Sequence, residues 1–188
     1  MDRPDIPRLI GDLMRFGTIE SVDFDAATCR VRAGDIVTGD IPWITRAGRI
    51  TLWAPPSIGE QCVLFTPEGD QEAAFALSGL FSTAFPSPAT NADLTLIAFA
   101  DGARLSYDQA AHTLAVALPA GGRITLTAPA GVAIEGDVAI EGKVDIRGDV
   151  AIDGKLDATG DLTGQGVSLK THRHKDVQAG GAISGPPQ

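Results

Sequence analysis

Hydrophobic and polar positions along the chain follow three different periods. Residues 4–15 carry apolar side chains at positions 6, 9, 10, 13 and 14, which predicts a short helix. Between residues 16 and 80, short apolar segments alternate with Gly, Pro and Asp turn signals. That second pattern is typical of an all-β barrel of the OB type. The third period, of six residues, begins at residue 131.

A linker and hairpins are predicted between the barrel and the repeat. Residues 82–93 are rich in Pro, Ser and Ala, as linkers are. Beyond them, Asp101 and Gly102 form a strong hairpin-turn dipeptide. The segments TLAVAL and RITLTA alternate with period two, which predicts half-buried strands. His112 lies in a turn-like segment, where we expect it to be a solvated turn residue.

Residues 131–166 consist of six consecutive hexads that all end in glycine. They read GVAIEG, DVAIEG, KVDIRG, DVAIDG, KLDATG and DLTGQG. Positions 2, 4 and 6 lie on one face of a strand, which is apolar, apolar and Gly, while the other face is mostly charged. One such ribbon cannot bury its apolar face alone, and the array is too short for a stable single-chain β-helix. We therefore predict an intertwined, triple-stranded β-helix made by three chains, with a core that thins toward its C-terminal end.

The first position of successive hexads alternates in charge. From the second hexad onward it reads Asp137, Lys143, Asp149, Lys155 and Asp161. Exposed ion pairs contribute only ~0–1 kcal/mol each. A slip of one hexad between chains would nevertheless place like charges side by side, so the alternation favours a single register.

Two of the three histidines follow the repeat and form a candidate metal site. If strand-like alternation continues through VSLKTHRH, His172 and His174 lie on the face that carries Val and Ile in the hexads. Three chains would then bring six imidazoles together, which suits an octahedral transition metal better than tetrahedral zinc. The alternative is a pair of exposed histidines on a tail; the repeat and the matching parity favour the metal site.

Composition narrows the function classes. A net charge of −9 opposes binding to nucleic acid or to anionic lipid, and four barrel arginines at 30, 32, 46 and 49 are offset by acids. The N-terminal residues lack the apolar core of a secretory signal, and no segment approaches the ~18 apolar residues of a membrane span. We therefore expect a soluble chain made in the cytoplasm. Cys29 and Cys62 are expected to be buried apolar residues instead of a disulfide.

The sequence also argues against catalysis. His172 and His174 lie among Gly and Lys, without the Ser, Cys or paired acid that a histidine-based catalytic set needs. The glycine spacing in GDVAIEGKV does not fit a phosphate-binding loop. We expect neither an enzymatic activity nor a small-molecule substrate.

The chain resembles the gpV-type baseplate spike proteins of contractile-tailed phages, including Mu-like phages. The matching stretches are WITRAG, WAPPSIGEQCVLFTPEGD, LSGLFS, FADGARLSYDQAAHTLAV, the hexads and GVSLKTHRHKDVQAGGAISGPP. The resemblance implies a homotrimer whose OB domain docks on the baseplate hub and tail-tube proteins. It also implies that His172 and His174 hold one iron ion per trimer in a metal-capped apex. Arg173 departs from the family's pattern, although on a strand it would face outward.

The implied protein is a non-enzymatic central spike in the virion, at the tip of the tail baseplate, assembled in the host cytoplasm. It would puncture the host outer membrane when the sheath contracts. Alternatives are the spike of a phage-tail-like bacteriocin or type VI-like system, or a trimeric fibre or adhesin; the lack of aromatic residues after Tyr107 disfavours an adhesin. The linker at 83–93 is too short for the lysozyme domain that some related spikes carry. The expected divisions are 1–15 (helix), 16–82 (OB domain), 83–93 (linker), 94–130 (hairpin neck), 131–166 (β-helix) and 167–188 (apex).

Overall fold

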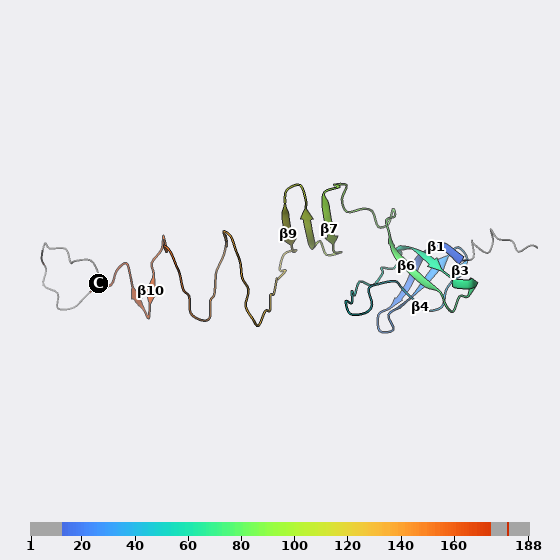
Figure 1. Cartoon of the computed structure of the whole chain (residues 1–188), viewed down its shortest axis with the longest axis horizontal. Coiled ribbons are helices and arrows are strands. Elements are labelled where there is room, and N and C mark those ends of the chain that lie inside the picture. Colours follow the sequence, from blue (N-terminus) through green and yellow to red (C-terminus); the bar gives the residue numbers. More distant parts are fainter. Residues whose placement is uncertain (1–12, 174–179, 181–188) are drawn as a thin grey trace, which may run out of the picture. The chain divides into compact units, whose positions relative to one another are not determined.

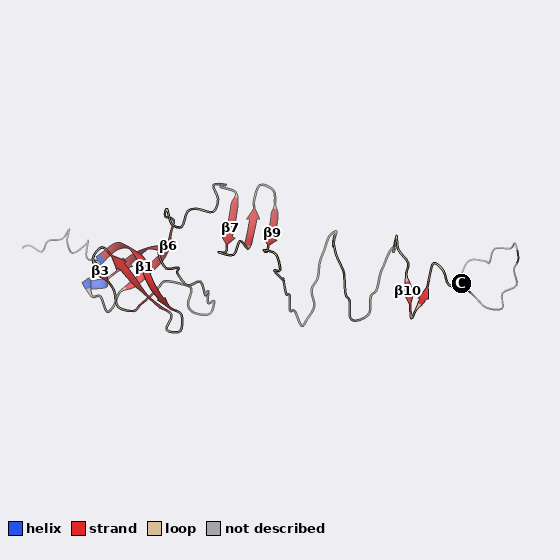
Figure 2. Ribbon diagram, turned by 180° about the vertical axis from the view of Figure 1, so that it is seen from behind, coloured by secondary structure: helices blue, strands red, loops and turns tan. Residues whose placement is uncertain are grey.

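The computed structural model describes residues 13–173 and residue 180. Contacts divide the chain into two units, one ending at Thr127 and the other beginning at Ala128. Nearly all regular structure in the described residues is β (Figures 1 and 2), which confirms the all-β prediction. Across those residues, no helix is both long enough and apolar enough to cross a membrane.

The first unit begins with a small antiparallel barrel. Its main sheet has the order β3-β2-β1-β5-β6, and β4 pairs with β2. A bridge between Trp43 and Ala76 joins the end of β4 to β6 and closes the sheet on itself; the Ile44 N–H donates to the Ala76 carbonyl at 2.8 Å. The elements are β1 (Met14–Asp23), β2 (Thr28–Ala33), β3 (Ile36–Val37), β4 (Ile41–Pro42), β5 (Gln61–Phe65), the 3-10 turn η1 (Pro67–Gly69) and β6 (Phe75–Leu80).

Alternation of side chains along these strands builds the barrel core. In β2 and β5 every second residue is buried, and Ile19, Val31, Cys29 and Cys62 are its largest fully buried side chains. Gly17 of β1 faces β2 so closely that an added Cβ would lie 2.5 Å from Val31 Cγ1. Only glycine allows this approach of the two backbones.

A three-stranded meander follows the barrel within the same unit. It consists of β7 (Leu94–Ala98), β8 (Arg104–Asp108) and β9 (Thr113–Ala117), in that order and antiparallel. Gly102 has φ +93° in the first turn, and His112 is exposed with φ +52° in the second. Both turn predictions are confirmed. The strand predicted at RITLTA does not form in the single chain, because residues 123–128 pair with no other strand.

The second unit is extended chain until its last residues. Glycines end most hexads at positive φ, from +126° at Gly136 to +151° at Gly154, and the chain bends between extended segments (Figure 1). No residue from 129 to 162 belongs to a strand. A short hairpin of β10 (Thr163–Gly164) and β11 (Val167–Ser168) follows.

Two local predictions need correction. Met14 and Arg15 do not end a helix; they begin β1, because their backbones pair with Phe65 and Leu64 of β5. Residues 4–12 of that predicted helix lie outside the described residues. The last hexad is also not a further extended repeat, because Gln165 and Gly166, at φ +49° and +82°, turn the chain back on itself.

Candidate functional site

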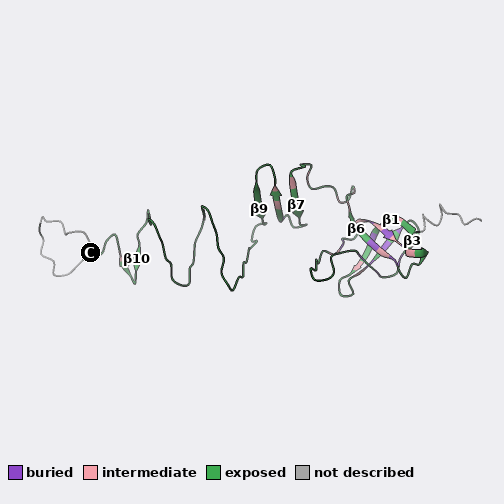
Figure 3. Cartoon of the chain, in the orientation of Figure 1, coloured by how far each residue is buried: buried purple, intermediate pink, exposed green. Residues whose placement is uncertain are grey.

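The even-numbered residues of the hexads form an exposed apolar ribbon. Valine and isoleucine side chains between residues 132 and 152 are 53–71% exposed, and Figure 3 colours this segment as exposed throughout. Burying one such side chain fully gains about 1.5–3 kcal/mol. A continuous apolar surface of this kind marks an interface with other protein chains.

The same parity extends upstream of the hexads. Leu114 and Val116 of β9, and then Leu118, Ile124 and Leu126, are all even-numbered and 41–77% exposed. Sequence reasoning placed this stretch in a separate neck. The signal that was missed is that these exposed apolar positions share the even numbering of the apolar positions in the hexads.

The polar face carries a local ion pair. Lys155 Nζ lies 2.7 Å from Asp157 Oδ2 in the same hexad, and both side chains are about 80% exposed. Lys143 and Asp145 repeat this spacing two hexads earlier. Because the observed pair is solvated, it contributes little to stability, and its role is to keep this face polar.

The turn after β11 presents the first candidate metal ligand. His172 is exposed, and its backbone N–H donates to the Ser168 carbonyl at 3.1 Å. Its ring Nδ1 lies 2.9 Å from the same oxygen and 3.2 Å from the Leu169 carbonyl. Carbonyl oxygens only accept, so these two contacts require the proton on Nδ1, and a ring without a second proton would then have its lone pair on Nε2.

This arrangement suits a metal ligand. Ligating histidines commonly donate their second ring N–H to a carbonyl, which fixes the tautomer. His174 lies outside the described residues. Within the described part of the chain, no group of three or more His, Cys, Asp or Glu side chains gathers to hold a metal. A complete ligand set therefore requires other chains or residues beyond this part.

We predicted that strand-like alternation continues from the hexads to the histidines and places both on the face of the apolar ribbon. That prediction is wrong for residues 165–171. The chain reverses at Gln165 and Gly166, and residues 169–171 form a second turn. Local hydrogen bonding, not a continuing strand, positions His172.

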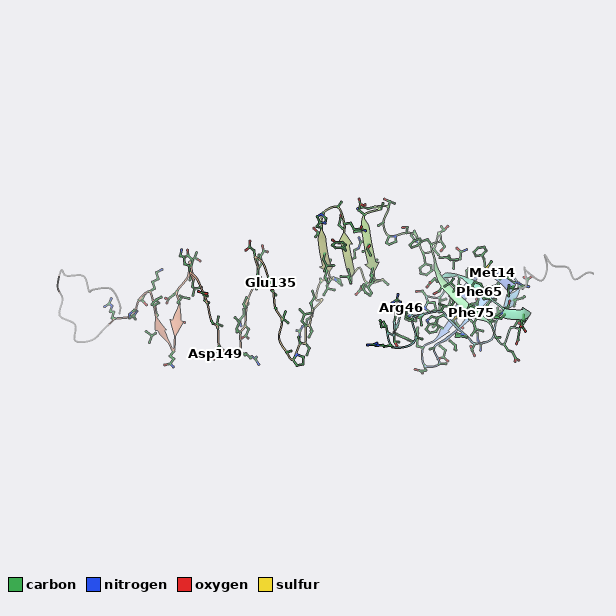
Figure 4. All side chains as sticks on the ribbon, in the orientation of Figure 1. Met14, Arg46, Phe65, Phe75, Glu135 and Asp149 are labelled. Atoms are coloured by element: carbon green, nitrogen blue, oxygen red, sulfur yellow. The ribbon has the colours of Figure 1, made fainter. Side chains whose placement is uncertain are left out.

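A long barrel loop forms a second exposed surface. Residues 44–59 carry exposed apolar side chains and, at 46 and 49, two arginines. Trp53 is 58% exposed and its ring lies 5.7 Å from that of buried Trp43. In Figure 4, Arg46 lies at one end of the barrel and the stacked pair Phe65–Phe75 at the other. The exposed apolar residues of the loop are Ile44, Ile50, Leu52, Trp53 and Ile58.

The other arginines predicted to be offset by acids are paired. Arg30 Nε donates to Asp40 at 2.8 Å, and Arg32 Nε donates to Glu20 at 2.8 Å. These hydrogen bonds hold the pKa of both carboxyls below their usual range. The barrel surface formed by β1 and β2 is therefore electrically balanced, in contrast to the loop at 44–59.

The two cysteines are structural. Cys29 and Cys62 are both buried and form no disulfide, as predicted. Burial raises the pKa of each thiol to about 11, so they remain protonated apolar residues of the core.

Three family models match successive parts of the chain. Residues 15–81 match the type VI secretion system/phage-baseplate injector OB domain. Residues 95–164 match the Gp138 β-helical trimerization domain, and residues 166–188 match the GpV apex motif. An injector barrel, a trimerization β-helix and an apex in this order define a baseplate spike, and the chain belongs to the gpV-type family of these proteins.

A relative is the spike protein of Escherichia phage P2. It is 36% identical to this chain over 132 residues, which are 66% of this chain. The match spans 63% of the length of the P2 protein. The OB and β-helix predictions are confirmed by these matches. The trimerization match begins at residue 95, so it includes the meander and the segment that shares the parity of the hexads.

Proposed function

We propose that the chain forms the homotrimeric central spike of a contractile-tail baseplate, with a mechanical and non-enzymatic role. The observation that carries this proposal is the apolar ribbon, which a single chain leaves exposed along the whole repeat. It coincides with the match to a trimerization domain. Three chains can direct their ribbons at a common axis and remove them from water.

Such a trimer suits penetration of a membrane. Its β-helix would be held by apolar burial along its length, and its core side chains decrease from Val and Ile to Leu and Gly toward the apex. Driven by sheath contraction, it would puncture the host outer membrane. The similarity to the P2 spike favours a virion tail tip assembled in the host cytoplasm, although the injector barrel also suits a bacteriocin or type VI-like system.

The barrel loop at residues 44–59 is the surface we assign to the baseplate hub. It combines apolar side chains with Arg46 and Arg49 on a chain of net charge −9. Apolar anchors such as Trp53, together with arginine, are typical of interface centres. An acidic, partly apolar surface on the hub would complement it.

We further propose that His172 and His174 from three chains hold one iron ion at the apex. The described geometry supports this at His172, whose Nδ1–H bonds to carbonyls and whose lone pair is on Nε2. When bound, the metal would cross-link three chain ends where the apolar core is thinnest. Its binding free energy would then contribute to folding of the apex.

The spike proposal is tested by substituting one position on each face of the ribbon. Ile146→Asp places a charge on the face assigned to the axis, whereas Arg147→Asp changes the neighbouring outward position. We expect Ile146→Asp to abolish the trimer in sedimentation analysis and Arg147→Asp to preserve it. Equal behaviour of the two variants would refute a threefold core built from the even-numbered face.

A further inference from the structure

The turn that carries His172 is fixed by a hydrogen-bonded network beginning at Asp161. This carboxylate precedes β10, and its Oδ1 accepts the Lys170 N–H at 3.1 Å. The neighbouring Ser168 hydroxyl and the Lys170 N–H hold the pKa of Asp161 below its usual range. The Leu169 N–H donates to the Leu162 carbonyl at 2.8 Å. The two ends of the β10–β11 hairpin are thereby tied together.

Ser168 is the centre of this network. Its Oγ accepts the Thr171 N–H at 2.9 Å and the Thr171 hydroxyl at 2.8 Å. A serine hydroxyl has two acceptor positions, and Thr171 uses both of them.

The Ser168 carbonyl extends the network to the histidine. It receives both the backbone N–H and the ring Nδ1 of His172, at 3.1 and 2.9 Å. The Ser168 side chain thus stabilises the turn through Thr171, while the Ser168 carbonyl fixes the orientation of the His172 ring. No comparable network is needed to form the hairpin itself, which Gln165 and Gly166 already close through their turn conformations.

We propose that Asp161 and Ser168 are positioning residues that hold the His172 ring with Nε2 as its ligating nitrogen. The inference rests on the proposed metal role of His172 and adds how the ligand is oriented. It also gives Asp161 a role distinct from the other acidic first positions of the hexads. Outer partners of this kind change metal affinity by about 10–100-fold when they are removed.

The first test examines the ring without metal. The full chain contains three histidines, so ¹⁵N-histidine labelling after chelator treatment resolves each tautomer, and His112→Asn assists assignment. We expect His172 to be protonated on Nδ1 in the unaltered chain and in Ser168→Thr, which keeps the hydroxyl. In Ser168→Ala and in Asp161→Ala, we expect part of the His172 population to carry the proton on Nε2. An Nε2–H ring in the unaltered chain, or a tautomer insensitive to both alanine variants, overturns the inference.

The second test measures retention of ferrous ion against a competing chelator, with the oligomeric state recorded on each sample. We expect Ser168→Ala and Asp161→Ala to bind about 10–100-fold more weakly, with Ser168→Thr and the matched control Asp149→Ala unchanged. Equal affinity in all variants removes the positioning role and leaves the metal site standing. If the unaltered chain binds no metal but the tautomer result holds, the metal proposal fails and the positioning of His172 stands.

Discussion

At the level of single residues, one glycine explains how closely strands β1 and β2 approach each other in the barrel. Gly17 lies where a Cβ would meet Val31 Cγ1 at 2.5 Å and the Arg32 carbonyl oxygen at 2.9 Å. Cys29 and Cys62 fill the same core as protonated thiols. Sequence reasoning identified the thiols as buried from their strand positions, but no local pattern distinguishes Gly17 from a turn glycine.

Gly17→Val is expected to destabilise the barrel. The added side chain must displace Val31 or separate β1 from β2, and overpacking of this kind costs about 1–3 kcal/mol. Denaturant unfolding followed by fluorescence of Trp43 and Trp53 measures the change. Gly39→Val is the control, because nothing lies within 4 Å of a Cβ at that position. Equal stability of the two variants would contradict the close approach of the strands.

The buried thiols predict slow modification in the folded chain. A thiol with a pKa of about 11 has about 100-fold less thiolate than one at the ordinary value of 9.0 when the pH is below both, and the thiolate is the reactive form. We expect a disulfide reagent at pH 8 to modify neither Cys29 nor Cys62 until denaturant is added. Rapid modification of the native protein would show that the core is open.

At the level of strands and turns, the six-residue repeat predicts extended chain, whereas local turn conformations and pairing with distant strands override that prediction at particular residues. The six-residue period correctly predicted the ribbon and its glycines, because each hexad repeats the same strand parity. It failed in the last hexad, where Gln165 and Gly166 form a hairpin turn although Gly166 still ends a formal repeat. The predicted helix failed at Met14 and Arg15, where pairing with β5 overrides local apolar spacing. Pairing with distant strands is not visible in a local pattern.

The hairpin at the end of the repeat should respond to acid. The pKa of Asp161 is lowered from 3.8 by hydrogen bonds from Ser168 and Lys170. Its contribution is therefore complete above pH 3.8 and is lost as the pH falls through the lower, folded pKa. We expect the Lys170 amide resonance to stay constant from pH 7 to 5 and to move only below pH 3.8. A midpoint at or above 3.8, or the same titration in Asp161→Asn, would argue against the hydrogen bond between Asp161 and the Lys170 N–H.

At the level of the whole molecule, the barrel buries its apolar side chains within one chain, whereas the hexads do not. The barrel has its own buried core, whereas the apolar side chains of the hexads are 42–71% exposed in a single chain. The sequence predicted this division because a hexad ribbon has no second layer of its own. It did not predict that the apolar side chains of β9 are also exposed in a single chain, since the period-two alternation of TLAVAL was interpreted as a half-buried strand.

Native mass spectrometry of the purified full chain measures the number of chains and the bound metal together, so it tests the proposed trimer and its metal in one experiment. We predict three chains of 19.5 kDa in one species, with a single metal ion per trimer that is lost in the double variant His172→Ala, His174→Ala. A monomer of 19.5 kDa at micromolar concentration would contradict the threefold core, and with it the proposed spike.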